Sequence, residues 1–120
     1  MDRRQLAARI DHTLLAPDAG PADIERLCAE AVEHGFYAVC VNPWLLPLAV
    51  RLLSGHAPLP ITVAGFPLGA NLGVSKAEET ARAVALGAAE VDMVLNVGAF
   101  KAGQHGLARE EIASVVEAAG

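Results

Sequence analysis

Four short apolar segments, each followed by a helix-like pattern, are the feature that most limits how this chain can fold. Strands are predicted at residues 7–12, 37–42, 61–66 and 90–96. Parallel strands joined by helical crossovers form an α/β sheet or barrel, because parallel strands need a long connection between them. A closed eight-stranded barrel usually needs about 250 residues. The 120 residues therefore predict four βα units in one domain, residues 1–120, which amounts to half of such a barrel.

The charge and hydropathy patterns exclude several classes of partner. The formal net charge is -5, and the sequence contains no basic stripe or run of Lys and Arg, so nucleic acids and anionic membrane surfaces are disfavoured. No apolar run approaches the roughly 18 residues of a membrane span, and no apolar stretch typical of a signal peptide follows the N-terminus. We expect a cytoplasmic protein that binds neither nucleic acid nor membranes.

The cysteines and histidines do not form a ligand pattern. Cys28 and Cys40 lie in a helical and a strand segment, without ligand-like spacing to histidine, so reduced thiols are expected. The four histidines are widely spaced, and therefore neither a metal site nor a cofactor is predicted. Since no base lies beside Cys40 in the sequence, we expect it to line a pocket rather than act as a nucleophile.

Helix signals follow each strand. Pro21 suits a first helical turn and Gly35 a helix end, so a helix is predicted between them. The sequence at 75–78 has the pattern of a capping box. Small residues are expected to form the buried face of the helix that follows, and aliphatic residues that of the last helix. The first face comprises Ala77, Ala81, Val84, Ala85 and Ala88, and the second Ile112, Val115, Val116 and Ala119.

Two aspartates are the first candidates for chemistry. Asp92 interrupts the apolar strand between Val91 and Met93, where an unpaired carboxylate is costly and its pKa is easily shifted, as in general acids and bases. Asp11 holds a similar position in the first strand, followed by His12 and Thr13. Backbone-bound aspartates give the same pattern, so a structural role is open for both.

The two lysines are expected to be surface residues. Lys76 is the second residue of the capping-box pattern, and Lys101 follows the fourth strand on an expected loop. An imine-forming lysine needs an apolar pocket or a cationic neighbour that lowers its pKa. Neither lysine has such surroundings in the sequence. The spacing of the glycines at 65, 69 and 73 matches neither a P-loop nor the dinucleotide-binding fingerprint.

Four segments together resemble the deoxyribose-phosphate aldolase family of class I aldolases. They are Ile10-Asp11-His12-Thr13-Leu14-Leu15, Phe36-Tyr37-Ala38-Val39-Cys40-Val41-Asn42-Pro43, Gly65-Phe66-Pro67-Leu68-Gly69 and Gly87-Ala88-Ala89-Glu90-Val91-Asp92-Met93-Val94. They occur in the family's order and at family-like spacing. The resemblance covers nearly the whole chain.

The resemblance implies a TIM (β/α)₈ barrel with a short leading helix, which residues 2–9 could supply. It also implies reversible cleavage of 2-deoxy-D-ribose 5-phosphate to glyceraldehyde 3-phosphate and acetaldehyde, through a lysine Schiff base. Asp92 matches the family's proton donor and acceptor, and Asp11 an aspartate of the supporting polar network. Cys40 matches a pocket-lining cysteine, and Thr13 is expected to contact the substrate.

The segments that carry the family's imine-forming lysine, its second active-site lysine and its phosphate-binding loops have no match in the 120 residues. We therefore expect the N-terminal half of an aldolase barrel that is inactive alone. One alternative is a half-barrel that self-associates as a homodimer, or docks on a partner, to cover its open edges. Another is a related Schiff-base aldolase for a different sugar phosphate.

Overall fold

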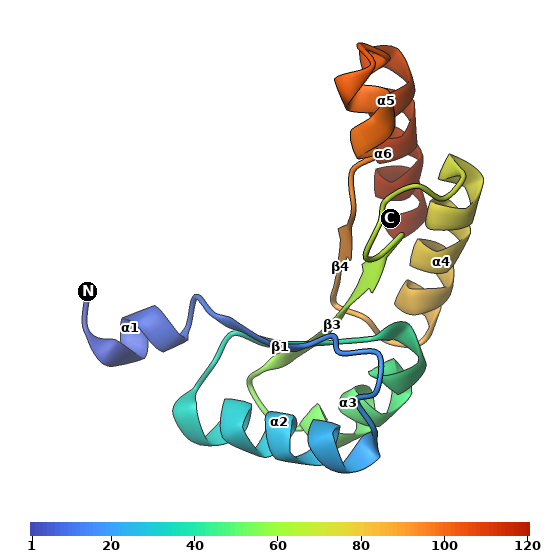
Figure 1. Ribbon diagram of the computed structural model, residues 1–120. Coiled ribbons are helices and arrows are strands. Elements are labelled where there is room, and N and C mark those ends of the chain that lie inside the picture. Colours follow the sequence, from blue (N-terminus) through green and yellow to red (C-terminus); the bar gives the residue numbers. More distant parts are fainter.

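The computed structural model describes residues 1–120, and its centre is one sheet of four parallel strands in the order β1-β2-β3-β4 (Figure 1). Each strand pairs with the next along the chain, and helices connect them on one side. The strands are β1 (Asp11–Leu14), β2 (Ala38–Val41), β3 (Leu59–Ala64) and β4 (Glu90–Met93). The helices are α1 (Arg3–Ala7), α2 (Pro21–His34), η1 (Pro43–Leu45), α3 (Leu46–Leu53), α4 (Gly73–Ala85), α5 (Val97–Lys101) and α6 (His105–Ala119).

The predicted arrangement of parallel strands and helices is confirmed, with different boundaries at the first, third and last strands, and β3 begins and ends two residues earlier than predicted. The N-terminal segment forms α1 instead of an early part of β1, because Asp2 and Gln5 cap it reciprocally. The predicted leading helix is therefore present, and it projects away from the sheet (Figure 1). β4 ends at Met93 because Asn96 begins α5, where its side chain accepts a hydrogen bond from the Ala99 amide. Lys101 thus ends a short helix and does not lie on a loop.

Both faces of the central strands are covered, as the apolar run of β2 predicts. Val39 and Val41 face the helices, where they pack with Ile24 of α2 and Leu46 of α3 in the larger apolar cluster. The opposite face carries a second, smaller cluster. Its buried members are Ala38, Cys40, Ile61 and Val63. This second face corresponds to the interior of a barrel, and we call it the inner face.

The predicted buried face of α4 is wrong, and that of α6 is correct only at Val115. α4 buries Lys76, Thr80 and Ala83, a face shifted by one residue from the predicted small-residue stripe. The Ser75 and Lys76 amides both bond to the Leu72 carbonyl, so Ser75 lies inside the first turn and caps nothing. The predicted capping box is therefore also wrong.

α6 packs beside α4 (Figure 1), and this arrangement decides which of its faces is buried. Its buried residues are Ala108, Glu111 and Val115, whereas Val116 of the predicted stripe is 65% exposed. The aliphatic pattern identified the helix but not the direction from which its neighbour approaches. No helix combines the length and the apolar character that crossing a bilayer requires.

Candidate active site

The predicted site residues come from three strands and share the inner face. Side chains alternate between the two faces of a strand, and residues paired across parallel strands point to the same side. Asp11 pairs with Ala38, Thr13 with Cys40, and Val63 with Asp92. Since Ala38, Cys40 and Val63 form the inner-face cluster, the structure brings together all four residues predicted from the sequence.

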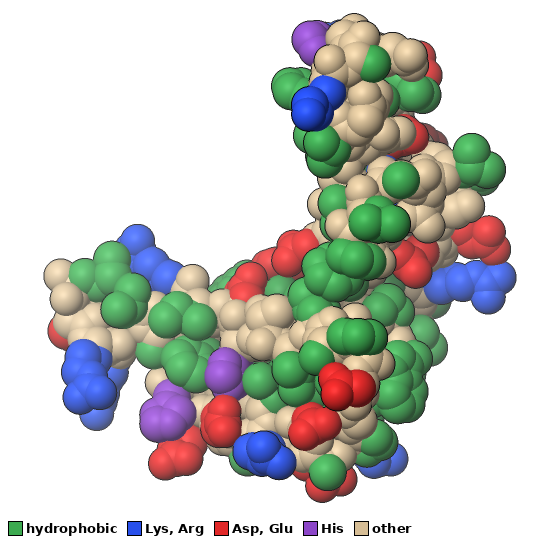
Figure 2. Space-filling view, viewed as in Figure 1, with side chains coloured by type: hydrophobic (Ala, Val, Ile, Leu, Met, Phe, Trp, Pro, Cys, Tyr) green, Lys and Arg blue, Asp and Glu red, His purple; other side chains and the backbone are tan.

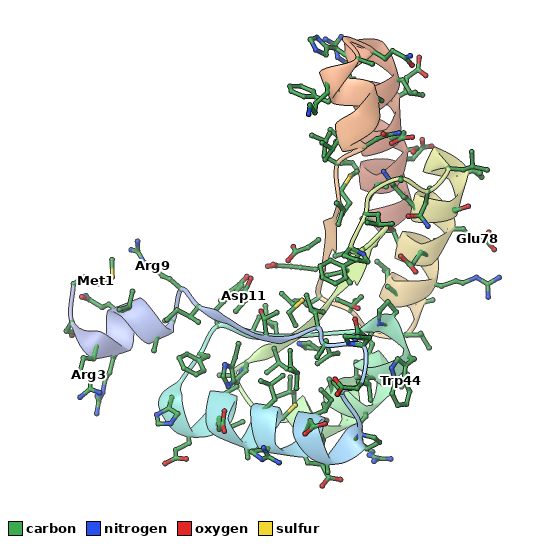
Figure 3. The ribbon with its side chains drawn as sticks, in the orientation of Figure 1. Met1, Arg3, Arg9, Asp11, Trp44 and Glu78 are labelled. Carbon is green, nitrogen blue, oxygen red and sulfur yellow. The ribbon has the colours of Figure 1, made fainter.

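Negative charge gathers on this face. The pKa of the Asp11 carboxyl is raised by partial burial first, and then by the charges of Asp92 and Glu90. Figure 2 shows acidic side chains in the concave angle of the molecule, and Figure 3 shows that Asp11 lies at this position. The neighbouring negative charges therefore favour the protonated form of Asp11.

Glu90 and Tyr37 belong to the same region but were not among the predicted residues. The Tyr37 hydroxyl donates a hydrogen bond of 2.5 Å to Glu90 Oε1. This bond, with the Glu90 charge, raises the pKa of the exposed Tyr37 hydroxyl. Glu90 lies two residues before Asp92 on the same strand, so strand alternation could have placed it on the inner face. Nothing in the sequence indicates that Tyr37 would reach it.

Burial keeps the thiol of Cys40 protonated. Desolvation, followed by the charges of Asp92 and Asp11, raises its pKa to about 12. The side chain is 2% exposed and lies among aliphatic neighbours. A protonated thiol is a poor nucleophile, which agrees with the expectation that Cys40 does not act as one.

Alkylation of Cys40 should therefore be slow in the folded protein. At pH 8 we expect iodoacetamide to modify Cys40 at least about 100-fold more slowly than a free cysteine, because so little thiolate is present. Cys28, whose pKa burial raises to about 11, should behave similarly and serves as the internal comparison. Both should react readily in urea, as measured by mass spectrometry over time. Rapid labelling of Cys40 alone in the folded protein would indicate an activated thiol and contradict this assignment.

Asp11 should contribute to a pH dependence of stability. The folded-state pKa of Asp11 is raised from 3.8, so protonation of Asp11 favours the folded protein. This stabilisation is fully present below pH 3.8 and is lost as the pH rises through the folded-state pKa. We expect Asp11→Asn to be more stable than the parent protein at pH 7, and the difference to vanish near pH 3. The gain should be below about 1 kcal/mol because Asp11 is exposed. Urea unfolding at several pH values measures the difference in unfolding free energy between the variant and the parent protein. If Asp11→Asn is still more stable at low pH, titration of Asp11 is not the cause.

Thr13 and His12 illustrate the two faces of β1. The Thr13 hydroxyl donates to the Asp11 carbonyl at 2.8 Å on the inner face. His12 points to the helices, where its Nε2 lies 2.7 Å from Glu30 Oε2. The centroids of the His12 and Phe36 rings are 4.8 Å apart. His12 therefore supports the fold and does not belong to the inner-face site.

The loop from Gly65 to Gly73 follows β3 and lies against the backbone that follows β4. The Gly65 amide donates to Glu79 Oε1 at 2.8 Å, and the Gly69 amide to the Gly65 carbonyl at 2.7 Å. Gly69 has a φ of 66°, and a Cβ there would lie 2.1 Å from the Leu95 carbonyl oxygen. Glycine is required because the loop touches the backbone that follows β4. This close approach holds the two chain segments together.

Lys76 is not a surface residue, contrary to the expectation from the sequence. It is 1% exposed, and its Nζ lies 3.1 Å from Glu111 Oε2. The partner is 35 residues away in the sequence and belongs to α6, so local patterns could not identify it. Lys101 is exposed, as expected. Neither lysine lies on the inner face.

A groove of about 420 Å³ lies elsewhere, between η1, α3 and α4. Trp44 and Glu78 line it, and Figure 3 shows both well away from Asp11. None of the inner-face site residues contributes to its lining. The groove is therefore separate from the candidate site. No group of three or more His, Cys, Asp or Glu side chains is arranged to hold a metal ion.

Comparisons with known proteins show which family the chain belongs to. The sequence matches the family described as "DeoC/LacD family aldolase" over residues 5–120. The chain belongs to this aldolase family. It is 50% identical over 119 residues to the deoxyribose-phosphate aldolase of Clostridium perfringens, covering 99% of this chain and 53% of that protein. It is 52% identical over 115 residues to deoxyribose-phosphate aldolase 1 of Cutibacterium acnes, covering 96% of this chain and 53% of that protein.

Solved structures of aldolases share the fold. A crystal structure from Coccidioides immitis superposes with a TM-score of 0.95 at 36% identity, covering 99% of this chain and 47% of that one. The tetrameric deoxyribose phosphate aldolase of Aeropyrum pernix gives a TM-score of 0.88 at 29% identity, and the match covers 98% of this chain and 49% of that one. The four-stranded sheet is thus half of an aldolase TIM-barrel fold. The chain spans about half the length of the relatives it matches.

Proposed function

We propose that this chain is the N-terminal half of a deoxyribose-phosphate aldolase, whose activity resides in the complete barrel. The reaction is the reversible cleavage of 2-deoxy-D-ribose 5-phosphate to glyceraldehyde 3-phosphate and acetaldehyde, through a lysine Schiff base. The observation that carries the proposal is the common inner face of Asp11, Cys40 and Asp92. The deoxyribose-phosphate aldolases of C. perfringens and C. acnes, at 50% and 52% identity, support the choice of substrate.

Within this proposal, Asp92 transfers protons at the substrate, directly or through water, as the imine forms and breaks down. Asp11 supports it by adding negative charge, which stabilises a cationic imine nearby. Cys40 supplies a small protonated side chain to the wall of the pocket, and Thr13 contacts the substrate. Together these residues form the proton-handling part of the site.

The imine-forming lysine is proposed to lie outside these 120 residues. A nucleophilic lysine must be unpaired and neutral when it attacks the aldehyde. Lys76 is held in an ion pair by Glu111, and Lys101 is exposed at the end of α5. The 120-residue chain alone is therefore proposed to be inactive. We place the complete protein in the cytoplasm, in deoxyribonucleotide and carbohydrate catabolism.

A half-barrel that pairs with a second copy or docks on another protein is the alternative favoured by the sheet edges. β1 and β4 each have a neighbouring strand on one side only, and unpaired strand edges readily accept another chain. Under this alternative the 120-residue chain would be the natural product and would form a dimer. A related Schiff-base aldolase for another sugar phosphate differs from the main proposal in its substrate alone.

The deciding experiment is to purify the natural gene product and measure its intact mass and aldolase activity. A mass near twice 12.4 kDa, with cleavage of 2-deoxyribose 5-phosphate, is the expected result. Reduction with borohydride in the presence of substrate should inactivate the enzyme by trapping the imine on a lysine. A product of 12.4 kDa without turnover, eluting at the size of a dimer, would overturn the main proposal in favour of the half-barrel. Imine trapping with turnover of a different sugar phosphate would favour the related aldolase.

A further inference from the structure

The buried ion pair between Lys76 and Glu111 has no role in the function proposed above. Its Nζ to Oε2 distance is 3.1 Å, and the two side chains are 0% and 8% exposed. Removing both charges from water costs free energy that the attraction between them often fails to repay, so a buried ion pair is weak evidence for a stabilising role. The contacts of the two side chains indicate that the pair has a different role.

Glu111 connects the pair to the segment that follows β4. Its Oε1 accepts a hydrogen bond of 3.3 Å from Asn96 Nδ2, while Asn96 Oδ1 accepts one of 3.1 Å from the Ala99 amide. Asn96 follows Asp92 by four residues. The pair therefore fixes the direction in which the chain leaves the strand that carries Asp92.

The same two side chains contact both ends of the loop that follows β3. A Cβ at Gly65 would lie 3.0 Å from Lys76 Cε, and one at Gly73 would lie 2.8 Å from Glu111 Cγ. The loop thus starts against the lysine and ends against the glutamate. One buried pair holds the segments at the carboxyl ends of two adjacent strands, which is where substrates bind in α/β barrels.

We propose that Lys76 and Glu111 are a positioning pair, which holds residues 65–73 and 94–99 in the arrangement that receives the substrate. Lys76 acts through Glu111 and Asn96 and does not touch the substrate. The inference rests on the proposed aldolase function for its kinetic consequence. Its structural consequence is independent of that function.

The decisive variant is the double substitution Lys76→Met/Glu111→Leu in the natural gene product. It replaces both charges by apolar side chains of similar size, so no unpaired charge stays buried. It also removes the carboxylate oxygen that accepts the hydrogen bond from Asn96 Nδ2. The single variant Lys76→Met leaves Glu111 buried without its cation and should lower the melting temperature strongly. The double variant should recover most of that loss.

Hydrogen exchange followed by mass spectrometry separates positioning from stability. In the double variant we expect exchange at 65–73 and 94–99 to stay at least about tenfold faster than in the parent protein, with β2 unchanged. The matched control is Arg82→Met/Glu78→Leu, which removes an exposed ion pair of 2.9 Å on the same helix α4. It should leave exchange in both segments unchanged. Parent-like exchange in the double variant would overturn the proposal and leave the pair a purely structural role.

Kinetics provide the second measurement. For 2-deoxyribose 5-phosphate, kcat/KM of the double variant should fall at least about tenfold, mainly through KM, because the misplaced segments receive the substrate poorly. The control variant should match the parent enzyme. If the parent protein has no aldolase turnover, the proposed function fails, and hydrogen exchange still decides whether the pair positions the two segments. An unchanged kcat/KM in an active enzyme whose segments have loosened would refute the link to substrate binding.

Discussion

Asp92→Asn is expected to lower aldolase turnover of the complete protein by about 10²–10⁴-fold, the usual contribution of a general acid or base. The amide has nearly the same shape as the carboxyl group but cannot accept and return a proton at the substrate. The fold should persist, because Asp92 is exposed and carries like charge to Asp11 and Glu90. Steady-state kinetics and thermal unfolding measure the two effects separately.

The same substitution has a second readout on the inner face. Since the charge of Asp92 contributes to the raised pKa of both Asp11 and Cys40, Asp92→Asn should lower both values. A carbon-detected titration of the Asp11 carboxyl would record this change. It does not depend on turnover, so it also tests the geometry in an inactive chain.

Glu90→Gln is the matched control for Asp92. Glu90 lies on the same strand and the same face, and its carboxylate is engaged by the Tyr37 hydroxyl. Turnover should fall less than about tenfold, because only a neighbouring charge is lost. Near-normal turnover of Asp92→Asn would remove Asp92 from the catalytic residues. Equal losses in the two variants would show that the overall negative charge matters instead of one proton carrier.

Gly69→Ala should destabilise the fold by about 3 kcal/mol or more, among the larger effects expected of a single substitution. The left-handed φ of 66° alone disfavours alanine by roughly 1–2 kcal/mol. The new Cβ would also lie 2.1 Å from the Leu95 carbonyl oxygen and 2.8 Å from Val94 Cγ1, so the loop or the segment after β4 must move. Urea unfolding gives the free energy of unfolding directly.

Gly103→Ala distinguishes the steric clash from the backbone preference. Gly103 also has a positive φ, of 78°, but a Cβ there would have no atom within 4 Å. Its cost should therefore stay near 1–2 kcal/mol, roughly the backbone term alone. Similar losses in both variants would mean that the loop yields easily to the added methyl group. In that case the contact between residues 69 and 95 does not restrain the loop.

The order of the elements and four residues of the inner face, Asp11, Thr13, Cys40 and Asp92, could be predicted from the sequence and the family resemblance. Pro21 and Gly35 predicted the bounds of α2, and the structure places the helix between them with Gly35 at a left-handed C-cap. The apolar run of β2 predicted a strand covered on both faces. Asp11 and Asp92 were assigned to one site through the family resemblance, whereas the sequence pattern alone left open which face of its strand Asp92 occupies. The pairing of the strands in the sheet decides that both side chains lie on the inner face.

The tertiary structure decided the partners and the orientation of whole helices. Lys76 pairs with Glu111 across 35 residues, His12 with Glu30 across 18, and Tyr37 with Glu90 across 53. A sequence pattern records which side chains repeat along one element, and therefore which element forms. It does not record which neighbour approaches that element, nor from which side. The buried lysine of α4 and the exposure of Ile112 and Val116 on α6 both follow from the way these two helices pack against each other.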